Sequence, residues 1–176
     1  MYSVGDYVVK ANNGVCRIVD MVHPDFAVKK DRLYYLMVPV GDESARVYVP
    51  VDGDSSEMRA VITEEEAWDV IGRIKDIEAA WISNDRLREQ FFKDAIRSLK
   101  PESLIGIIKN MYIRRMERLE QGKKSTAVDD RYFKIAENTL YSELAFAIGR
   151  NKEEMFELIK DSIEGGSGTY GEKGQN

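Results

Sequence analysis

The sequence of 176 residues contains one cysteine and one histidine, Cys16 and His23. Metal sites and His-based nucleophilic triads need several such side chains together, so neither kind of site is expected here. A single thiol cannot form an intramolecular disulfide, which agrees with a reducing compartment. We expect His23 to be exposed in a loop, Cys16 to be a small core residue of a strand, and no metal or cofactor to be bound.

Long apolar runs are also absent. The longest, such as residues 33–40 and 144–148, fall far short of the roughly 18–20 residues that a membrane span requires. The N-terminus has neither the basic nor the apolar region of a secretory signal, and no Gly-rich phosphate loop joins a strand to a helix. We therefore expect a cytoplasmic protein that is not an enzyme and has no membrane contact and no small-molecule substrate.

An overall excess of basic charge is lacking too, since 31 acidic against 26 basic residues give a net charge of −5. The acidic excess is not uniform, because residues 83–134 carry 13 basic and 8 acidic side chains and the flanking segments are all acidic. Two interpretations remain open on charge alone. Helical segments fluctuate by a few charges, and a basic block can also bind the phosphates of a nucleic acid.

The 43% of hydrophobic residues excludes wholesale disorder, and the first sixty residues have a β pattern. Short runs rich in β-branched and aromatic residues are separated by turn signals such as Asn12-Asn13-Gly14 and His23-Pro24-Asp25. Four or five short strands and no helix predict a small antiparallel barrel of the SH3 or Tudor type, closed so that no edge is exposed. The strands are expected near residues 7–9, 15–19, 33–38 and 45–49.

From Ile62 onward the apolar residues recur at helical spacing. Thr63 and Glu66 form a capping-box pattern, Pro101 stands at a first helical position and Gly149 ends a helix. We expect five amphipathic helices that pack into a compact domain. The predicted fold is thus α+β with two domains, a barrel at 1–61 and helices at 62–164, followed by a disordered tail at 165–176.

The two tryptophans have different surroundings. Trp68 lies within the first helix, and we expect it to pack in the core or against the barrel. Trp81 lies at a junction where the chain changes direction and the basic block begins. An aromatic ring beside cations can stack on or wedge into a base step of DNA, but composition alone slightly favours a buried Trp that closes a helix corner.

Several motifs resemble one known family. They are Val4-Gly5-Asp6-Tyr7-Val8-Val9 and Val47-Tyr48-Val49-Pro50 in the β half, and Trp81, Gln121-Gly122-Lys123-Lys124 and Tyr141-Ser142-Glu143-Leu144-Ala145 in the helical half. In this order they resemble the CarD/CdnL family of bacterial transcription regulators over about residues 1–164. The resemblance implies a Tudor-like barrel that binds the β subunit of RNA polymerase, and a helical domain that contacts promoter DNA weakly and without much sequence preference. It also implies that Trp81 acts as a minor-groove wedge that stabilises the open complex.

The resemblance and the basic block together give candidate site residues. Those expected to bind DNA are Trp81, Arg86, Arg88, Lys109, Arg114, Arg115, Arg118, Lys123 and Lys124, and those expected to bind the polymerase are Arg46 and Tyr48. The alternative function is that of a protein–protein adaptor, which links the polymerase to a second protein and does not bind DNA.

Overall fold

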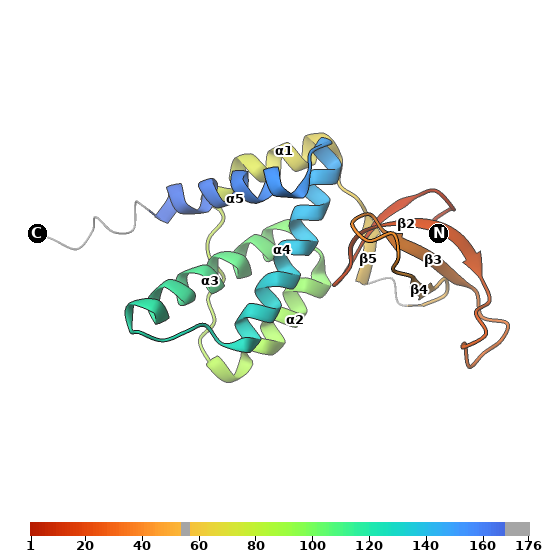
Figure 1. Cartoon of the computed structure of the whole chain (residues 1–176), viewed down its shortest axis with the longest axis horizontal. Helices are drawn as coiled ribbons and strands as arrows, with labels where there is room; N and C mark the ends of the chain where they lie inside the picture. The colour runs from red at the N-terminus through yellow and green to blue at the C-terminus, as the bar shows by residue number, and fades with distance from the viewer. Residues whose placement is uncertain (54–56, 168–176) are drawn as a thin grey trace, which may run out of the picture.

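The computed structural model describes residues 1–53 and 57–167, which form a five-stranded antiparallel sheet followed by five α-helices (Figure 1). The strands are β1 (Tyr7–Lys10), β2 (Gly14–Val22), β3 (Tyr34–Pro39), β4 (Val47–Pro50) and β5 (Met58–Ala60). The helices are α1 (Glu64–Arg73), α2 (Arg88–Ser98), α3 (Pro101–Glu120), α4 (Ala127–Ile148) and α5 (Lys152–Ser167), with short 3-10 helices η2 (Ile74–Asp76) and η3 (Asp85–Leu87). The predicted α+β class and the order of strands before helices are confirmed.

The sheet is a curled half-barrel, with strand order β4-β3-β2-β1-β5. A register shift between Ile18 and Asp20 of β2 bends the sheet. The curled sheet is consistent with the predicted Tudor-like barrel, although β4 and β5 are the two terminal strands and do not pair with each other. The strand β5 has only three residues, and Arg59 at its centre is bonded to the helical half of the molecule.

Local sequence signals set the helix ends. Thr63 and Glu66 form the predicted capping box at the start of α1, Pro101 occupies the first turn of α3, and Gly149 ends α4 in the left-handed conformation. The helix α5 continues to Ser167, so the expectation of disorder from residue 165 is wrong for its first three residues. The rest of that predicted tail lies outside the described residues.

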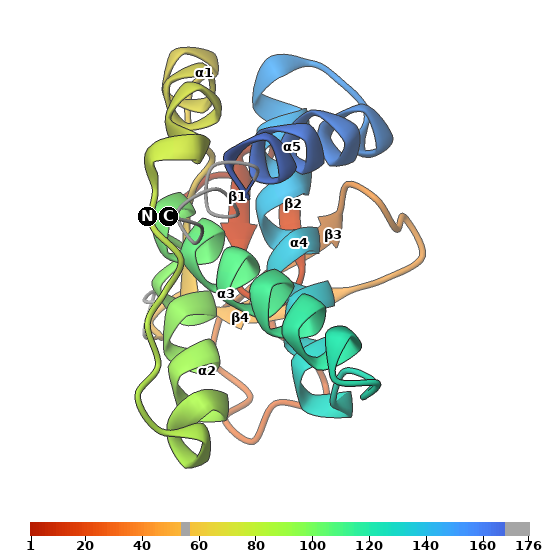
Figure 2. The ribbon, with the colours of Figure 1, turned by 90° about the vertical axis from the view of Figure 1, so that its left-hand side faces the viewer.

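The core shows that the two halves pack as one body. A small cluster that includes Cys16 and Met37 fills the half-barrel. The larger cluster contains the buried faces of the helices together with Val9, Ala11 and Val15 from β1, β2 and the turn between them. In Figure 2 α4 lies over β2, the strand against which it packs. The domain division at residues 61 and 62 therefore marks a change of secondary structure that the apolar core crosses.

An ion pair fixes this junction. Arg59 of β5 donates two hydrogen bonds to Glu143 of α4, one of them 2.8 Å long, and its Nε donates to the carbonyl of Leu99 at 3.0 Å. Glu143 is fully buried, and its Oε1 also accepts from the Ile62 amide at 3.1 Å. The ion pair thus joins α4 to the last strand and to the connection to α1 through Glu143, and to the end of α2 through Arg59.

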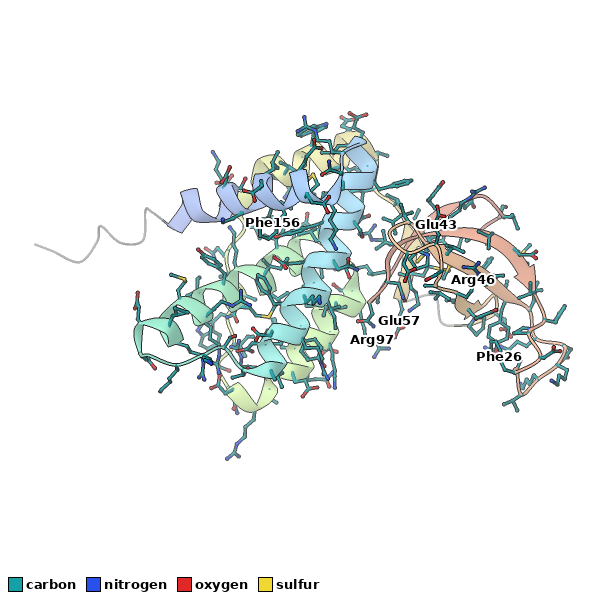
Figure 3. All side chains as sticks on the ribbon, in the orientation of Figure 1. Phe26, Glu43, Arg46, Glu57, Arg97 and Phe156 are labelled. Atoms are coloured by element: carbon teal, nitrogen blue, oxygen red, sulfur yellow. The ribbon has the colours of Figure 1, made fainter. Side chains whose placement is uncertain are left out.

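A close approach and a second ion-pair cluster support the same junction. A Cβ at Gly14, where φ is +72°, would lie 2.3 Å from Ser142 Oγ, so only glycine lets the β1–β2 turn meet α4. Glu57, ahead of β5, is paired with both Lys10 and Arg97, and Figure 3 shows Glu57 and Arg97 between the half-barrel and the helices. The relative orientation of the two halves is therefore held by packing and by charge.

Candidate nucleic-acid interface

Trp81 lies in an extended segment, residues 77–84, which connects η2 to η3 and which we call the strap. The Ala80 amide donates to the Gly106 carbonyl of α3 at 2.9 Å, and Asn110 Nδ2 donates to the Ala80 carbonyl at 2.7 Å. These two bonds hold the residue before Trp81 against α3. The tryptophan itself is 82% exposed. A large aromatic side chain is thus presented to solvent from a backbone that is fixed.

The exposure of Trp81 differs from the slight preference for a buried tryptophan that composition gave. Trp68 differs as well, because it is 40% exposed and is not among the residues of the hydrophobic core. Its Nε1 donates to Glu64 at 3.4 Å, and the Arg150 guanidinium lies 5.5 Å from the ring centre. Ala67, the residue before Trp68 in α1, is buried in the core instead. The two tryptophans therefore differ in that Trp68 has side-chain partners at the surface.

Lys109 is not part of an exposed basic surface. Its ammonium group donates to the carbonyls of Ile74 and Ile77, so it binds the backbone at both ends of the turn that leads into the strap. Partial burial lowers its pKa, an effect that the charge of Asp76 opposes. The expectation that Lys109 contacts DNA is therefore corrected, because its ammonium group is bonded to the backbone that leads into the strap.

Arg88 is also removed from the candidate DNA contacts, because it is buried at 7% exposure. Its Nη2 lies 3.2 Å from Asn110 Oδ1 and 3.4 Å from Asp129 Oδ1. Arg114 binds the other oxygen of Asp129 at 3.0 Å and also Asp85 of η3 at 2.9 Å. Both guanidinium groups thus meet carboxylates that come from within the basic block, and they join η3, α2, α3 and α4.

Arg115 and Arg118 have intramolecular partners at the surface. The Arg115 guanidinium donates to Asp130 at 3.1 Å and lies 4.6 Å from the ring centre of Phe133. Arg118 Nε donates to the carbonyl of Lys124 at 2.8 Å. The Arg118 guanidinium has no carboxylate partner among the described residues. Of these two residues, Arg118 keeps the more available charge.

The remaining candidates are exposed and carry no ion pair in the described part of the chain. They are Arg86 of η3 and Lys123 and Lys124 of the α3–α4 connection. In Figure 1 both segments lie on the side of the helices away from the sheet. We call Trp81, Arg86, Arg118, Lys123 and Lys124 the tryptophan surface. It combines one exposed ring with four cations that no carboxylate neutralises within residues 1–53 and 57–167.

The half-barrel presents a different surface at β4. Tyr48 is 37% exposed, and its ring meets that of Phe26 edge to face with centroids 4.9 Å apart. Arg46 is exposed ahead of β4, and its guanidinium is held by the carbonyls of Glu43 and Ala45. Figure 3 shows Phe26 and Arg46 on the half-barrel, far from the helices. Because β4 is a terminal strand, this surface combines aromatic side chains with an unpaired strand edge.

Two features of the molecule were missed by sequence reasoning. Phe26, at 65% exposure, had no strand pattern around it that would mark it as a surface aromatic. Glu143 stood in a motif that supported the family resemblance, but its role in the junction depends on Arg59, which is 84 residues away. The available signal was an acidic residue on an otherwise apolar stretch of helix, which implies a buried cationic partner.

The histidine and the cysteine of the chain lie in different surroundings. His23 is exposed and its Nδ1 lies 3.2 Å from the Arg32 carbonyl, and Cys16 is buried, as predicted. Burial raises the pKa of the Cys16 thiol to about 11, so it is not a reactive thiolate near neutral pH. The described residues contain no group of three acidic, His or Cys side chains placed to hold a metal ion, and no helix long and apolar enough to cross a membrane.

The molecule thus has a curled sheet with exposed aromatic residues at a terminal strand, joined to a helical body from which Trp81 is exposed. Comparison with known families specifies the class. Residues 2–62 match the family model of the CarD-like/TRCF RID domain. The N-terminal sheet thus matches the CarD-like/TRCF RID domain, and this match supports a transcription factor that interacts with RNA polymerase. A search of curated proteins found no match to the chain.

Proposed function

We propose that this transcription factor binds the β subunit of RNA polymerase through the β4 side of the half-barrel and stabilises the promoter open complex through the tryptophan surface. The observation that carries the proposal is the 82% exposure of Trp81 on a strap whose neighbouring residue is hydrogen-bonded on both sides to α3. An exposed tryptophan adds no stability to the fold that would explain its place there. Held in this way, it is suited to bind another molecule.

The physical mechanism is a difference in affinity for two states of the promoter. Separating a base step costs a few kcal/mol, and an aromatic side chain inserted at the edge of the bubble replaces part of the lost stacking. The closed duplex offers no such site. A protein that binds the open form better shifts the population toward it without any catalytic group.

The cations of the tryptophan surface set the position of the ring. Arg86 follows Trp81 by five residues, and Arg118, Lys123 and Lys124 lie at the end of α3. Contacts from these groups to phosphates carry no sequence information, so they fit a factor that acts at many promoters. Four cations give weak and salt-sensitive binding of free DNA, and the acidic charge of the remaining chain keeps that binding weak.

The proposal requires a fixed distance between β4 and Trp81, and the junction between the half-barrel and the helices supplies it. A wedge acts only if the polymerase places it at the upstream edge of the bubble, so the distance from β4 to Trp81 must be fixed. Glu143 is fully buried between Arg59 and the Ile62 amide, which ties the half-barrel to the helices. The strap is in turn held on α3 by Asn110 and Lys109. Each link from the polymerase surface to the ring is therefore a packed or hydrogen-bonded contact.

The test is the lifetime of the open complex in a reconstitution with cognate polymerase on a weak promoter. At a saturating concentration, Trp81→Ala is expected to shorten the lifetime about tenfold, which corresponds to about 1.4 kcal/mol of lost stacking. Trp68→Ala, the matched control, removes an exposed tryptophan outside the tryptophan surface and leaves the lifetime unchanged. Tyr48→Ala is expected to raise the concentration needed for half-maximal effect while preserving the lifetime at saturation.

The same experiment separates the adaptor alternative. A specific observation favours it: Ile113, Met116 and Leu119 of α3 are between 45% and 60% exposed, and exposed apolar side chains on one helix can bind a protein. An unchanged lifetime with Trp81→Ala, together with polymerase binding that Tyr48→Ala still weakens, contradicts the wedge and supports the adaptor.

A further inference from the structure

A groove lies on the helical half, apart from both surfaces described above. A hollow of about 550 Å³ is lined by α4, α5 and Asn12 of the β1–β2 turn, and an adjoining one of about 480 Å³ is lined by α3, α4 and α5. The two share Lys134, Glu137, Tyr141 and Phe156. Each volume is within the range of small-molecule sites. The strap contacts Gly106 and Asn110 on another side of α3, so the groove is separate from the tryptophan surface.

The floor of the groove is aromatic. The rings of Tyr141 and Phe156 meet edge to face with centroids 6.2 Å apart, and Phe133 lines the hollow beside them. Phe156 is 41% exposed, although it lies between helices, and Figure 3 shows it on the side of α5 that faces α3 and α4. A flat, partly exposed aromatic floor is suited to stack on a planar ring.

The rim carries ammonium groups that no carboxylate neutralises within the described residues. Lys134 and Lys160 are exposed and have no ion pair in that part of the chain. Lys152 donates to Asn138 Oδ1, which is uncharged. Lys152 also favours the charged form of Glu137, so the ammonium groups of the groove without a carboxylate partner among the described residues are those of Lys134 and Lys160.

The acidic groups of the groove have different surroundings. Asp130 on the rim is held by Arg115 at 3.1 Å and by Ser125 at 2.6 Å, and these hydrogen bonds lower its pKa. Glu153 is exposed at the outer edge. The remaining carboxylate, Glu137, lies half-buried in the floor and is therefore placed to accept a hydrogen bond from a ligand.

Glu137 accepts one long hydrogen bond, in which the Tyr141 hydroxyl donates at 3.4 Å. Burial raises the pKa of Glu137, while Tyr141, Arg115 and Lys152 favour its charged form. A long single hydrogen bond leaves most of the acceptor capacity of this carboxylate unused. Ring N–H and exocyclic amino groups of a nucleobase are donors of the kind that would use it.

We propose that this groove binds a free nucleoside phosphate. The base stacks on Phe156 and donates to Glu137, and the phosphates are bound by Lys134 and Lys160, which line the same hollow as these two residues. The aromatic floor matches the base, the acceptor beside it matches the donors of the base, and the two ammonium groups match the phosphates, whereas an acidic peptide would leave the Glu137 acceptor facing like charge. This site goes beyond the proposed action at promoters and does not depend on it.

The test is equilibrium binding of ATP and of GTP to the full chain, measured by titration calorimetry at physiological salt. We expect saturable binding of at least one of them to a single site, and a loss of about tenfold in affinity for each of Lys134→Ala and Lys160→Ala. Phe156→Ala is expected to weaken binding by a similar factor, and Lys134→Arg to retain it. The control is Lys100→Ala, which removes an exposed lysine outside the groove and leaves binding unchanged.

Four outcomes overturn the proposal. They are the absence of saturable binding of both nucleotides at millimolar concentration, equal weakening by Lys100→Ala and Lys134→Ala, retained binding in Lys134→Ala and Lys160→Ala alike, and tighter binding of an oligothymidylate than of either nucleotide. The last outcome assigns the groove to single-stranded DNA. Circular dichroism and the melting temperature of Lys134→Ala, Lys160→Ala and Phe156→Ala, compared with the parent chain, check that the affinities refer to folded protein.

Discussion

The junction between the half-barrel and the helices differs from the tryptophan surface in whether its polar side chains have partners within the molecule. At the junction Arg59 and Glu143 satisfy each other, and both also bind backbone groups. On the tryptophan surface Trp81 is 82% exposed, and Arg86 has no ion pair among the described residues. The first region uses charge to fix an orientation. The second leaves an aromatic ring and several charges available to a partner.

This difference changes the meaning of the basic block at residues 83–134. Several of its cations meet acids of the same block, as Arg88 and Arg114 meet Asp129 and Arg131 meets Glu89. A count of charges along the chain includes these cations, although they are paired with carboxylates and hold helices together. The part of the net +5 that is available for phosphates is concentrated in the few cations without such partners.

The largest effect is expected from breaking the junction. Glu143→Ala leaves Arg59 without its carboxylate and the Ile62 amide without its acceptor, and we expect the free energy of unfolding in urea to fall by about 3 kcal/mol. The control is Arg97→Ala, which removes an exposed ion pair with Glu57 and is expected to cost less than about 1 kcal/mol. Equal losses in the two variants would contradict a structural difference between the two ion pairs.

How much of this could be predicted from the sequence depends on the range of the interactions. Thr63 with Glu66 and Pro101 act within one turn of their own helix, so the helix starts followed from local patterns. The pairing of Arg59 with Glu143 and the open edge of the sheet at β4 depend on elements far apart in the chain. No local pattern contains that information.

The candidate site shows the same limit. The position of Trp81 at the start of the basic block was visible in the sequence, but its exposure depends on how the strap binds α3 through Asn110. Lys109 and Arg88 looked like surface cations, because helical spacing does not reveal which carbonyl or carboxylate lies opposite. The pattern thus located the region of the site, and tertiary contacts decided which of its cations are available.

A smaller loss is expected behind the tryptophan surface. Asp129→Ala removes the carboxylate shared by Arg88 and Arg114 and leaves the Arg88 charge buried, so we expect unfolding in urea to become easier by about 2 kcal/mol. Asp130→Ala is the matched control, because it lies at the next position of the same first turn and pairs with Arg115 at the surface. Its expected change is within about 1 kcal/mol. If the control lost as much as Asp129→Ala, the helix N-terminus rather than the buried pairs would explain both losses.

The smallest effect on stability, and the one that separates the two regions most sharply, is expected when the free cations are removed. The triple variant Arg86→Ala, Lys123→Ala and Lys124→Ala touches no ion pair within the described residues, so its free energy of unfolding should stay within about 0.5 kcal/mol of the parent chain. The dependence of its DNA binding on salt should weaken, with the slope of log affinity against log salt reduced by about 0.9 for each phosphate that the variant no longer neutralises. The matched triple variant Arg73→Ala, Lys93→Ala and Arg131→Ala removes the same charge from exposed cations that are each paired with a carboxylate. If both triples reduced the slope equally, total charge rather than pairing would govern DNA binding, and the distinction between the two regions would not extend to function.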